Sequence, residues 1–204
     1  AEATETEQIQ AQHLRFFLTW AEKVGQENEH EAAWQEQIAA ESDNLWSALQ
    51  WSATSGNAEA GLQLAHALHP YWMRRGYWQE EYQWLTRLLA LPQTAPPTLV
   101  RAKVLTHAGH LALRLVDSAT AVLFYQESLA LARQLQSMPD TVMALLGLGD
   151  SQTDHATAQI LYEESLALSR AADYEAGAAR SLTVLGHLAS GAGHYQEAQR
   201  LYEE

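Results

Sequence analysis

The chain has 204 residues, of which 47% are hydrophobic and 18% charged, so its composition excludes a disordered chain and allows a buried core. Its formal net charge is −13, from 25 acidic and 12 basic side chains, and such a surface disfavours direct binding of nucleic acid or of an anionic membrane. The lack of cysteine excludes disulfides and thiolate metal sites and fits a cytoplasmic location. No apolar run approaches the ~20 residues of a membrane span, and no signal peptide is recognisable.

The beginning of the chain predicts amphipathic helices. Apolar residues recur every three or four positions over residues 9–24, which predicts a helix that ends at Gly25. The same periodicity resumes over residues 33–51. Within that stretch, Ser42 and Asp43 either cap a new helix or lie in a continuous one.

Two further helices are expected before the clearest break in the sequence. One spans residues 58–73 and should kink or end at Pro70, because proline lacks the backbone N–H that a helix interior requires. Gly76 separates it from a second helix over residues 78–89. Residues 93–98 include two adjacent prolines, which predicts a linker.

A repeat follows the linker. Residues 121–133 and 158–170 are similar along their whole length, and a third copy begins at residue 198. The tyrosines that occupy the same place in the three copies are 37 and 40 residues apart, at positions 125, 162 and 202. This spacing matches a solenoid unit built of two helices.

Small and apolar residues place these copies in the tetratricopeptide frame, in which small side chains let the two helices of a unit approach closely. The frame is met in the first unit by Leu105, Gly109, Ala112, Ala121 and Tyr125, and in the third by Leu182, Leu185, Gly186, Ala189, Ala198 and Tyr202. The middle unit is three residues short between Gly149 and Ala158. Either its first helix or its inter-helix turn should therefore be abbreviated.

Together these patterns predict an all-α chain with two parts. Residues 99–204 are expected to form a right-handed α-solenoid of tetratricopeptide-like helical hairpins. An irregular helical region at residues 1–92 precedes it, and the end of the chain is expected to cut the last unit short.

The first region also carries a pattern of small, apolar and aromatic residues: His13, Phe16, Phe17, Ala21, Trp34, Glu41, Asn44, Leu45, Ala48, Leu49, Trp51, Gly61, Leu62, Leu64, Ala65, Leu68, Trp72, Gly76, Trp84, Leu85 and residues 88–92. With the repeats that follow, it resembles the sensor portion of STAND-type signalling proteins, the nucleotide-switched ATPases that include many bacterial transcriptional regulators. The resemblance covers nearly the whole chain from residue 8. It implies a module that binds an inducer or protein partner, holds an ATPase off until that partner arrives, and then helps to assemble an oligomer.

No constellation of residues predicts catalysis or a cofactor. The Gly-x-x-x-x-Gly-Lys-Ser/Thr loop that cradles nucleotide phosphates is missing, so no ATPase activity is assigned to this chain. Gly191 and Gly193 lie between two predicted helices and not after a strand, which indicates a turn rather than a dinucleotide loop. Paired carboxylates such as Glu80 and Glu81 are typical of a solvated helix, and nothing sets two of them across a cleft.

Histidines at helical spacing do not predict a metal site either. The segment His30-Glu31-Ala32-Ala33-Trp34 resembles a zinc-protease helix, but Trp34 stands where the second histidine is needed. Two pairs at i, i+3 spacing lack a third ligand placed by spacing: His66 with His69, and His107 with His110.

The strongest candidate for binding lies on the first helices of the repeats. In tetratricopeptide arrays the second, fifth and ninth positions of that helix face the concave groove. These positions hold Lys103, Thr106 and His110 in the first unit, Met143, Leu146 and Asp150 in the second, and Arg180, Thr183 and His187 in the third, with Arg114 near the same wall. A line of donors in an acidic protein suits recognition of carboxylate or phosphate. The alternative is a chance arrangement of surface residues.

A second candidate is the densest aromatic stretch of the chain, with two arginines in it. Trp72, Arg74, Arg75 and Trp78 predict a contact surface, since Trp and Arg often dominate the energy of interfaces. The alternative, which the sequence favours, is packing between helices.

With the resemblance, the sequence predicts a non-catalytic binding and regulatory module, the sensing part of a larger nucleotide-switched signalling protein. Its concave groove would receive a protein or peptide partner or a small anionic ligand. The alternative is a structural scaffold that associates with itself and binds no separate ligand. An enzyme would require convergent ionisable groups in a deep pocket.

Overall fold

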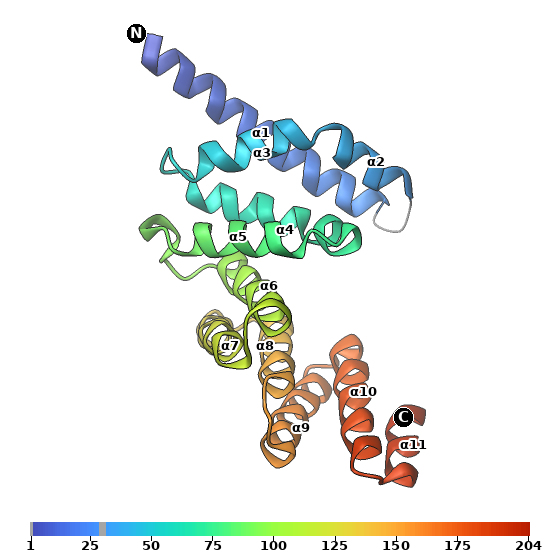
Figure 1. Cartoon of the computed structure of the whole chain (residues 1–204). Helices are drawn as coiled ribbons and strands as arrows, with labels where there is room; N and C mark the ends of the chain where they lie inside the picture. Colours follow the sequence, from blue (N-terminus) through green and yellow to red (C-terminus); the bar gives the residue numbers. More distant parts are fainter. Residues whose placement is uncertain (1, 29–31) are drawn as a thin grey trace. The chain divides into compact units, whose positions relative to one another are not determined.

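The computed structural model describes residues 2–28 and 32–204, and every regular element within these ranges is a helix (Figure 1). The chain divides into two compact units, Ala1–Pro96 and Pro97–Glu204, and the division falls inside the proline-rich segment.

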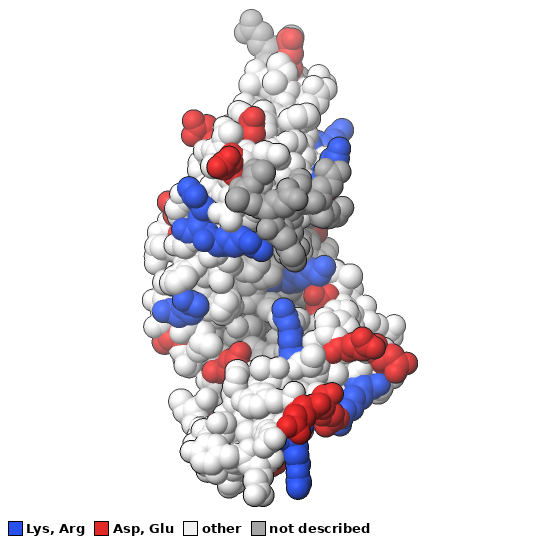
Figure 2. All heavy atoms as spheres, turned by 90° about the vertical axis from the view of Figure 1, so that its right-hand side faces the viewer, with Lys and Arg blue, Asp and Glu red and all other residues white. Residues whose placement is uncertain are grey.

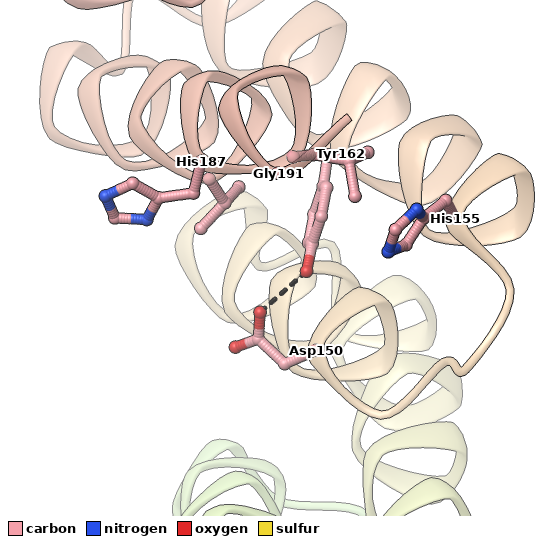
Figure 3. A pocket seen from close by; sticks show the side chains of 7 residues that line it. Asp150, His155, Tyr162, His187 and Gly191 are labelled. Atoms are coloured by element: carbon pink, nitrogen blue, oxygen red, sulfur yellow. Dashed lines mark hydrogen bonds between the residues drawn. The ribbon is translucent and has the colours of Figure 1, made fainter. Parts of the chain in front are cut away.

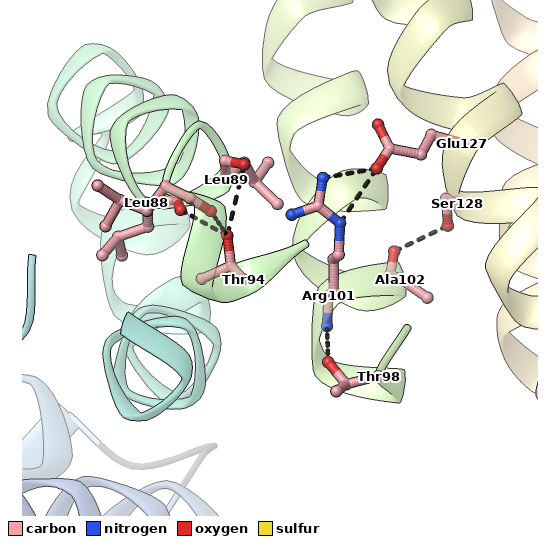
Figure 4. Close-up of polar contacts among 9 residues, drawn as sticks. Leu88, Leu89, Thr94, Thr98, Arg101, Ala102, Glu127 and Ser128 are labelled. Carbon is pink, nitrogen blue, oxygen red and sulfur yellow. Dashed lines mark hydrogen bonds and ion pairs between the residues drawn. The ribbon is translucent and has the colours of Figure 1, made fainter. Parts of the chain in front are cut away.

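The first unit is an irregular set of packed helices. Its elements are α1 (Glu2–Asn28), α2 (Ala32–Ala40), α3 (Ser42–Ser52), α4 (Ala58–Arg75), α5 (Trp78–Leu89) and a 3-10 turn, η1 (Pro92–Thr94). Helix α4 packs against α1, α3 and α5 and supplies much of the core. The hydroxyl of Thr94 donates to the carbonyl oxygens of Leu88 (2.9 Å) and Leu91 (2.8 Å) and so fastens η1 to the end of α5 (Figure 4).

Two helix boundaries in this unit differ from the sequence prediction. Helix α1 continues through Gly25, and α4 continues through Pro70 to Arg75, where Gly76 closes it in the left-handed conformation (φ 73°). In α4 the residues that follow the proline, Tyr71 and Trp72, are buried. Their burial offsets the ~3 kcal/mol that a proline costs inside a helix.

The open question at Ser42 is resolved in favour of a separate helix. Helix α3 begins at Ser42, and Glu41 occupies the N-cap position. The Glu41 carboxylate accepts a hydrogen bond from Asn44 Nδ2 at 2.7 Å. The cap residue is therefore Glu41, not Ser42 or Asp43.

The second unit is a run of three helical hairpins. They pair α6 (Leu99–Leu115) with α7 (Ser118–Gln134), α8 (Met138–Asp150) with α9 (His155–Ala171), and α10 (Glu175–Gly191) with α11 (Tyr195–Glu203). Each consecutive pair of helices in the unit is in contact, as a solenoid requires. The prediction of an all-α solenoid of tetratricopeptide-like hairpins is confirmed.

Close packing of a tyrosine on a glycine recurs in each hairpin. A methyl group added to the glycine of the first helix would stand less than 3 Å from the tyrosine ring of the second helix. The pairs are Gly109 with Tyr125, Gly149 with Tyr162, and Gly186 with Tyr202. The glycines of the tetratricopeptide frame thus admit the aromatic ring of the partner helix.

The middle hairpin is shortened in its first helix. Helix α8 has 13 residues, whereas α6 and α10 have 17 each. Helix α8 ends one residue after Gly149, while α10 runs five residues beyond the equivalent Gly186. Compared with the third hairpin, the first helix is four residues shorter and the turn after it is one residue longer, so the three-residue deficit lies in the helix.

Candidate functional site

The shortened helix leaves a hollow in the second unit, between the end of α8, the first turns of α9 and the last turns of α10. Its volume is about 260 Å³. It is lined by Asp150, His155, Tyr162, Val184, His187, Leu188 and Gly191 (Figure 3). In the other two hairpins the first helix extends past this level.

A carboxylate and a phenol form the polar centre of the hollow. The hydroxyl of Tyr162 donates to Asp150 Oδ1 at 2.7 Å. Burial of the ring raises the pKa of Tyr162, and the hydrogen bond to the Asp150 carboxylate raises it further. The phenol therefore stays protonated at neutral pH and acts as a donor, while the Asp150 side chain remains exposed to solvent.

Two imidazoles flank this centre. Figure 3 shows His187 and His155 on either side of the Tyr162 ring, with the phenol hydroxyl pointing at Asp150. His187 also packs edge-on against Tyr202 of α11, with ring centroids 5.7 Å apart. Asp150 and His187 occupy the ninth position of two consecutive repeat units, so the structure brings two predicted groove positions into one cavity.

The predicted groove positions nearer the start of α10 make other contacts. The guanidinium of Arg180 lies 2.9 Å from Met143 Sδ, so the second positions of the second and third units also meet. Thr183 donates its hydroxyl to the carbonyl of Ala179 in its own helix (2.8 Å) and is exposed. Neither Arg180 nor Thr183 lines the hollow.

The predicted positions on α6 face a different environment. The hydroxyl of Thr106 lies 2.8 Å from that of Ser128 in α7, and Ser128 donates to the carbonyl of Ala102 (2.8 Å; Figure 4 draws this bond). Thr106 therefore takes part in the contact between α6 and α7. Lys103 and His110 are half-buried on α6, and Arg114 near its end is exposed.

The aromatic stretch does not form one exposed surface. Trp72 is fully buried and stacks on Trp46, with centroids 5.7 Å apart and planes at 5°. The prediction that Trp72 belongs to a contact surface is wrong, because its ring fills the core of the first unit. Arg74 and Arg75 are exposed, and Arg74 lies over the ring of Trp34 at 5.7 Å. Trp78 is half-buried.

Among the residues that the structure describes, no three His, Asp or Glu side chains converge as a metal would require. The segment that resembles a zinc-protease helix falls partly outside these residues, since His30 and Glu31 are not described. Over the same described ranges, no helix is both long and apolar enough to cross a membrane.

A ladder of ion pairs, which the sequence prediction missed, links successive parts of the second unit. A glutamate stands two residues after each repeat tyrosine, and it pairs with an arginine of a preceding helix. The pairs are Glu127 with Arg101, Glu164 with Arg133, and Glu204 with Arg170. Figure 2 shows acidic and basic side chains side by side toward the lower end of the face in view. The repeat itself carries the signal, because Arg133 and Arg170 both stand eight residues after a repeat tyrosine.

Sequence reasoning also missed the other polar side chains of the hollow, those of His155 and Tyr162. The sequence identified Tyr162 only by its place in the repeat, and His155 lies in the first turn of α9. The signal that locates them is the three-residue deficit between Gly149 and Ala158. It brings the beginning of α9 up to the end of α8.

No protein-family model matches the chain, and no curated protein matches its sequence. Its fold is similar to that of two solved helical-repeat proteins. The crystal structure of BtubC (BKLC) from P. vanneervenii aligns with a TM-score of 0.60 and 14% identity, over 97% of this chain and 88% of that one. The crystal structure of MamA aligns with a TM-score of 0.53 and 18% identity, over 83% of this chain and 90% of that one. At such identities the likeness shows the fold alone, a tetratricopeptide-like solenoid suited to interaction with proteins.

Proposed function

We propose that this chain is a non-catalytic module that binds a polypeptide partner along α8 and α10 and thereby regulates a larger protein. The observation that carries the proposal is the hollow shared by Asp150 and His187. Ninth positions of consecutive repeat units line one cavity, and successive units of a solenoid commonly present such positions to a single partner.

A finer proposal concerns the larger protein. An irregular helical unit precedes the repeats, as in the sensor portions of STAND-type proteins, and this order supports a role as the sensing part of a cytoplasmic, nucleotide-switched signalling protein. The gene sequence upstream of this segment tests this finer proposal. We expect a Gly-x-x-x-x-Gly-Lys-Ser/Thr phosphate loop to be encoded upstream of this segment in the same frame. A frame without such a loop contradicts the nucleotide-switched role and leaves partner binding to be tested separately.

Partner binding is tested by a thermal-shift screen of capped peptides against the 204-residue chain, since a ligand that binds only the folded state raises Tm. We expect at least one peptide to raise Tm of the wild type but not that of the double variant Asp150→Ala/His187→Ala. The double variant Lys103→Ala/Arg180→Ala reports whether the predicted anion-binding positions take part. A peptide that stabilises all three proteins equally contradicts the groove assignment.

A second copy of the chain is the alternative partner, and one observation favours it. Leu123 in α7 and Ile160 in α9 each stand two residues before a repeat tyrosine, and they are 67% and 64% exposed. Exposed apolar side chains at equivalent positions of successive units suit association. Sedimentation equilibrium over about a hundredfold range of concentration distinguishes the two partners. A mass that rises with concentration, and that the double variant Leu123→Ser/Ile160→Ser returns to the monomer value, supports the scaffold.

A further inference from the structure

We infer that the hollow around Asp150 receives a single lysine or arginine side chain from the partner polypeptide. This inference rests on the proposed function and names the chemistry that the site would recognise. It replaces the anionic ligand expected from the sequence.

The charge of the lining selects a cation. Asp150 is the acidic residue among the seven that line the hollow, and none of the seven is lysine or arginine. One carboxylate offers about four acceptor positions. The single bond from Tyr162 therefore leaves acceptor capacity for the N–H groups of an incoming ammonium or guanidinium.

The shape of the lining suits a side chain that is apolar along its stem and charged at its tip. Val184 and Leu188 contribute apolar surface from α10, and the Tyr162 ring forms a third wall. Lysine and arginine bury their methylene stems on such surfaces while the charged head meets a polar group.

The size of the hollow indicates one side chain rather than a whole metabolite. Its volume of about 260 Å³ lies just below the range typical of sites for drug-sized ligands. A metal ion is disfavoured, because no three ligating side chains converge among the described residues. An anion would meet the Asp150 carboxylate, and Arg180 is directed at Met143 instead.

The net charge of the chain supports the same class of partner. A formal charge of −13 attracts a basic polypeptide over long range and repels an acidic one. Capture of the basic side chain by Asp150 would then fix the register of the partner on α8 and α10.

The test is an NMR titration of the 15N-labelled 204-residue chain with capped five-residue peptides that differ only at the central residue. The central residues are lysine, norleucine, acetyl-lysine and glutamate, and butylamine represents a free amine. We expect saturable shifts of the Tyr162 and Gly191 amides with the lysine peptide at low millimolar concentration. We expect no shifts there with the norleucine, acetyl-lysine and glutamate peptides, and weaker binding of butylamine, which lacks the peptide backbone.

Three variants make the test specific to the hollow. Asp150→Asn should weaken binding of the lysine peptide about tenfold. Gly191→Leu should block it, since Gly191 lines the hollow and a Cβ atom added there would meet no atom within 4 Å. Asp173→Asn makes the same chemical change at an exposed turn outside the hollow and should leave binding unchanged.

Several outcomes overturn the inference. They are equal binding of the lysine and norleucine peptides, undiminished affinity in Asp150→Asn, tighter binding of butylamine than of the peptide, and no saturable shift with any probe. If a peptide from the thermal-shift screen binds without regard to lysine or to Asp150, this inference fails while the proposed function stands. If no peptide stabilises the chain in that screen, the proposed function itself fails.

Discussion

The ring of Tyr125 in α7 lies so close to Gly147 in α8 that a methyl group on Gly147 would stand 2.2 Å from the Cε1 atom of the ring. The same ring lies against Gly109 of α6, where an added methyl group would stand 2.9 Å from it. One buried tyrosine thus joins its own hairpin to the next. The two glycines permit a contact that no larger residue allows.

We expect Gly147→Ala to lower the free energy of unfolding by about 1–3 kcal/mol, because the backbone of α8 or the Tyr125 ring must shift to admit the methyl group. Urea unfolding followed by far-UV circular dichroism measures the change. Gly191→Ala is the control in the same unit, since its methyl group would meet open space. If both variants are equally stable, the close contact between Tyr125 and Gly147 makes no measurable contribution to the free energy of unfolding.

Only part of this packing is predictable from the sequence. In the first and third tetratricopeptide units the glycine stands 16 residues before the repeat tyrosine, so Gly109 and Gly186 can be identified from the repeat alone. Gly147 stands outside that frame and contacts a tyrosine of the preceding unit. Its role depends on how two hairpins stack, which a pattern within one hairpin does not specify.

The candidate site shows the same limit. The three-residue deficit predicts an abbreviated element, but the hollow depends on the deficit falling in α8 and not in the turn that follows. Pro70 illustrates the opposite case, in which a strong local signal is overridden. The burial of Tyr71 and Trp72 keeps α4 helical through the proline. Tertiary packing determines both features, and the periodicity of the sequence gives only indirect information about that packing.

The ion-pair ladder is expected to stabilise the solenoid unevenly. Arg101 is 10% exposed and donates to Glu127 from both Nε (3.1 Å) and Nη2 (2.6 Å), whereas Arg133 is 52% exposed where it pairs with Glu164. Exposed pairs contribute ~0–1 kcal/mol and weaken in salt. Arg101→Ala should therefore destabilise the chain by about 2 kcal/mol, and Arg133→Ala by less than about 0.5 kcal/mol. Chemical denaturation in low and high salt measures both values, and equal effects would contradict the ranking.

The phenol of Tyr162 should make the unit sensitive to alkali. Burial and the neighbouring Asp150 carboxylate raise the pKa of Tyr162 above the value of about 10 that it takes in the unfolded chain. Its contribution to stability is thus fully present below pH ~10 and is lost as the pH rises through the folded pKa. The difference in unfolding free energy between wild type and Tyr162→Phe should shrink by up to about 1.4 kcal/mol per pH unit above that pH. If the difference in unfolding free energy stays constant from about pH 9 to about pH 11, this account is contradicted.

The buried carboxyl of Glu81 in the first unit should stabilise the fold most at acid pH. Glu81 is fully buried, and its Oε1 atom lies 2.5 Å from His69 Nδ1. Burial raises the pKa of Glu81 above its value of about 4.3 in the unfolded chain, and His69 offsets only part of this rise. The stability contributed by Glu81 is therefore fully present below pH ~4.3 and is lost as the pH rises through the folded pKa.

Replacing Glu81 with glutamine removes the buried charge and keeps a hydrogen-bonding partner for His69. We expect the stability of Glu81→Gln relative to wild type to increase as the pH rises above ~4.3 and then to level off. All seven tryptophans lie in the first unit, so tryptophan fluorescence during urea unfolding reports on it directly. Glu80→Gln makes the same chemical change at the neighbouring exposed position. If the relative stability of Glu81→Gln does not change between about pH 4 and pH 8, the His69 contact balances the cost of burying the charge.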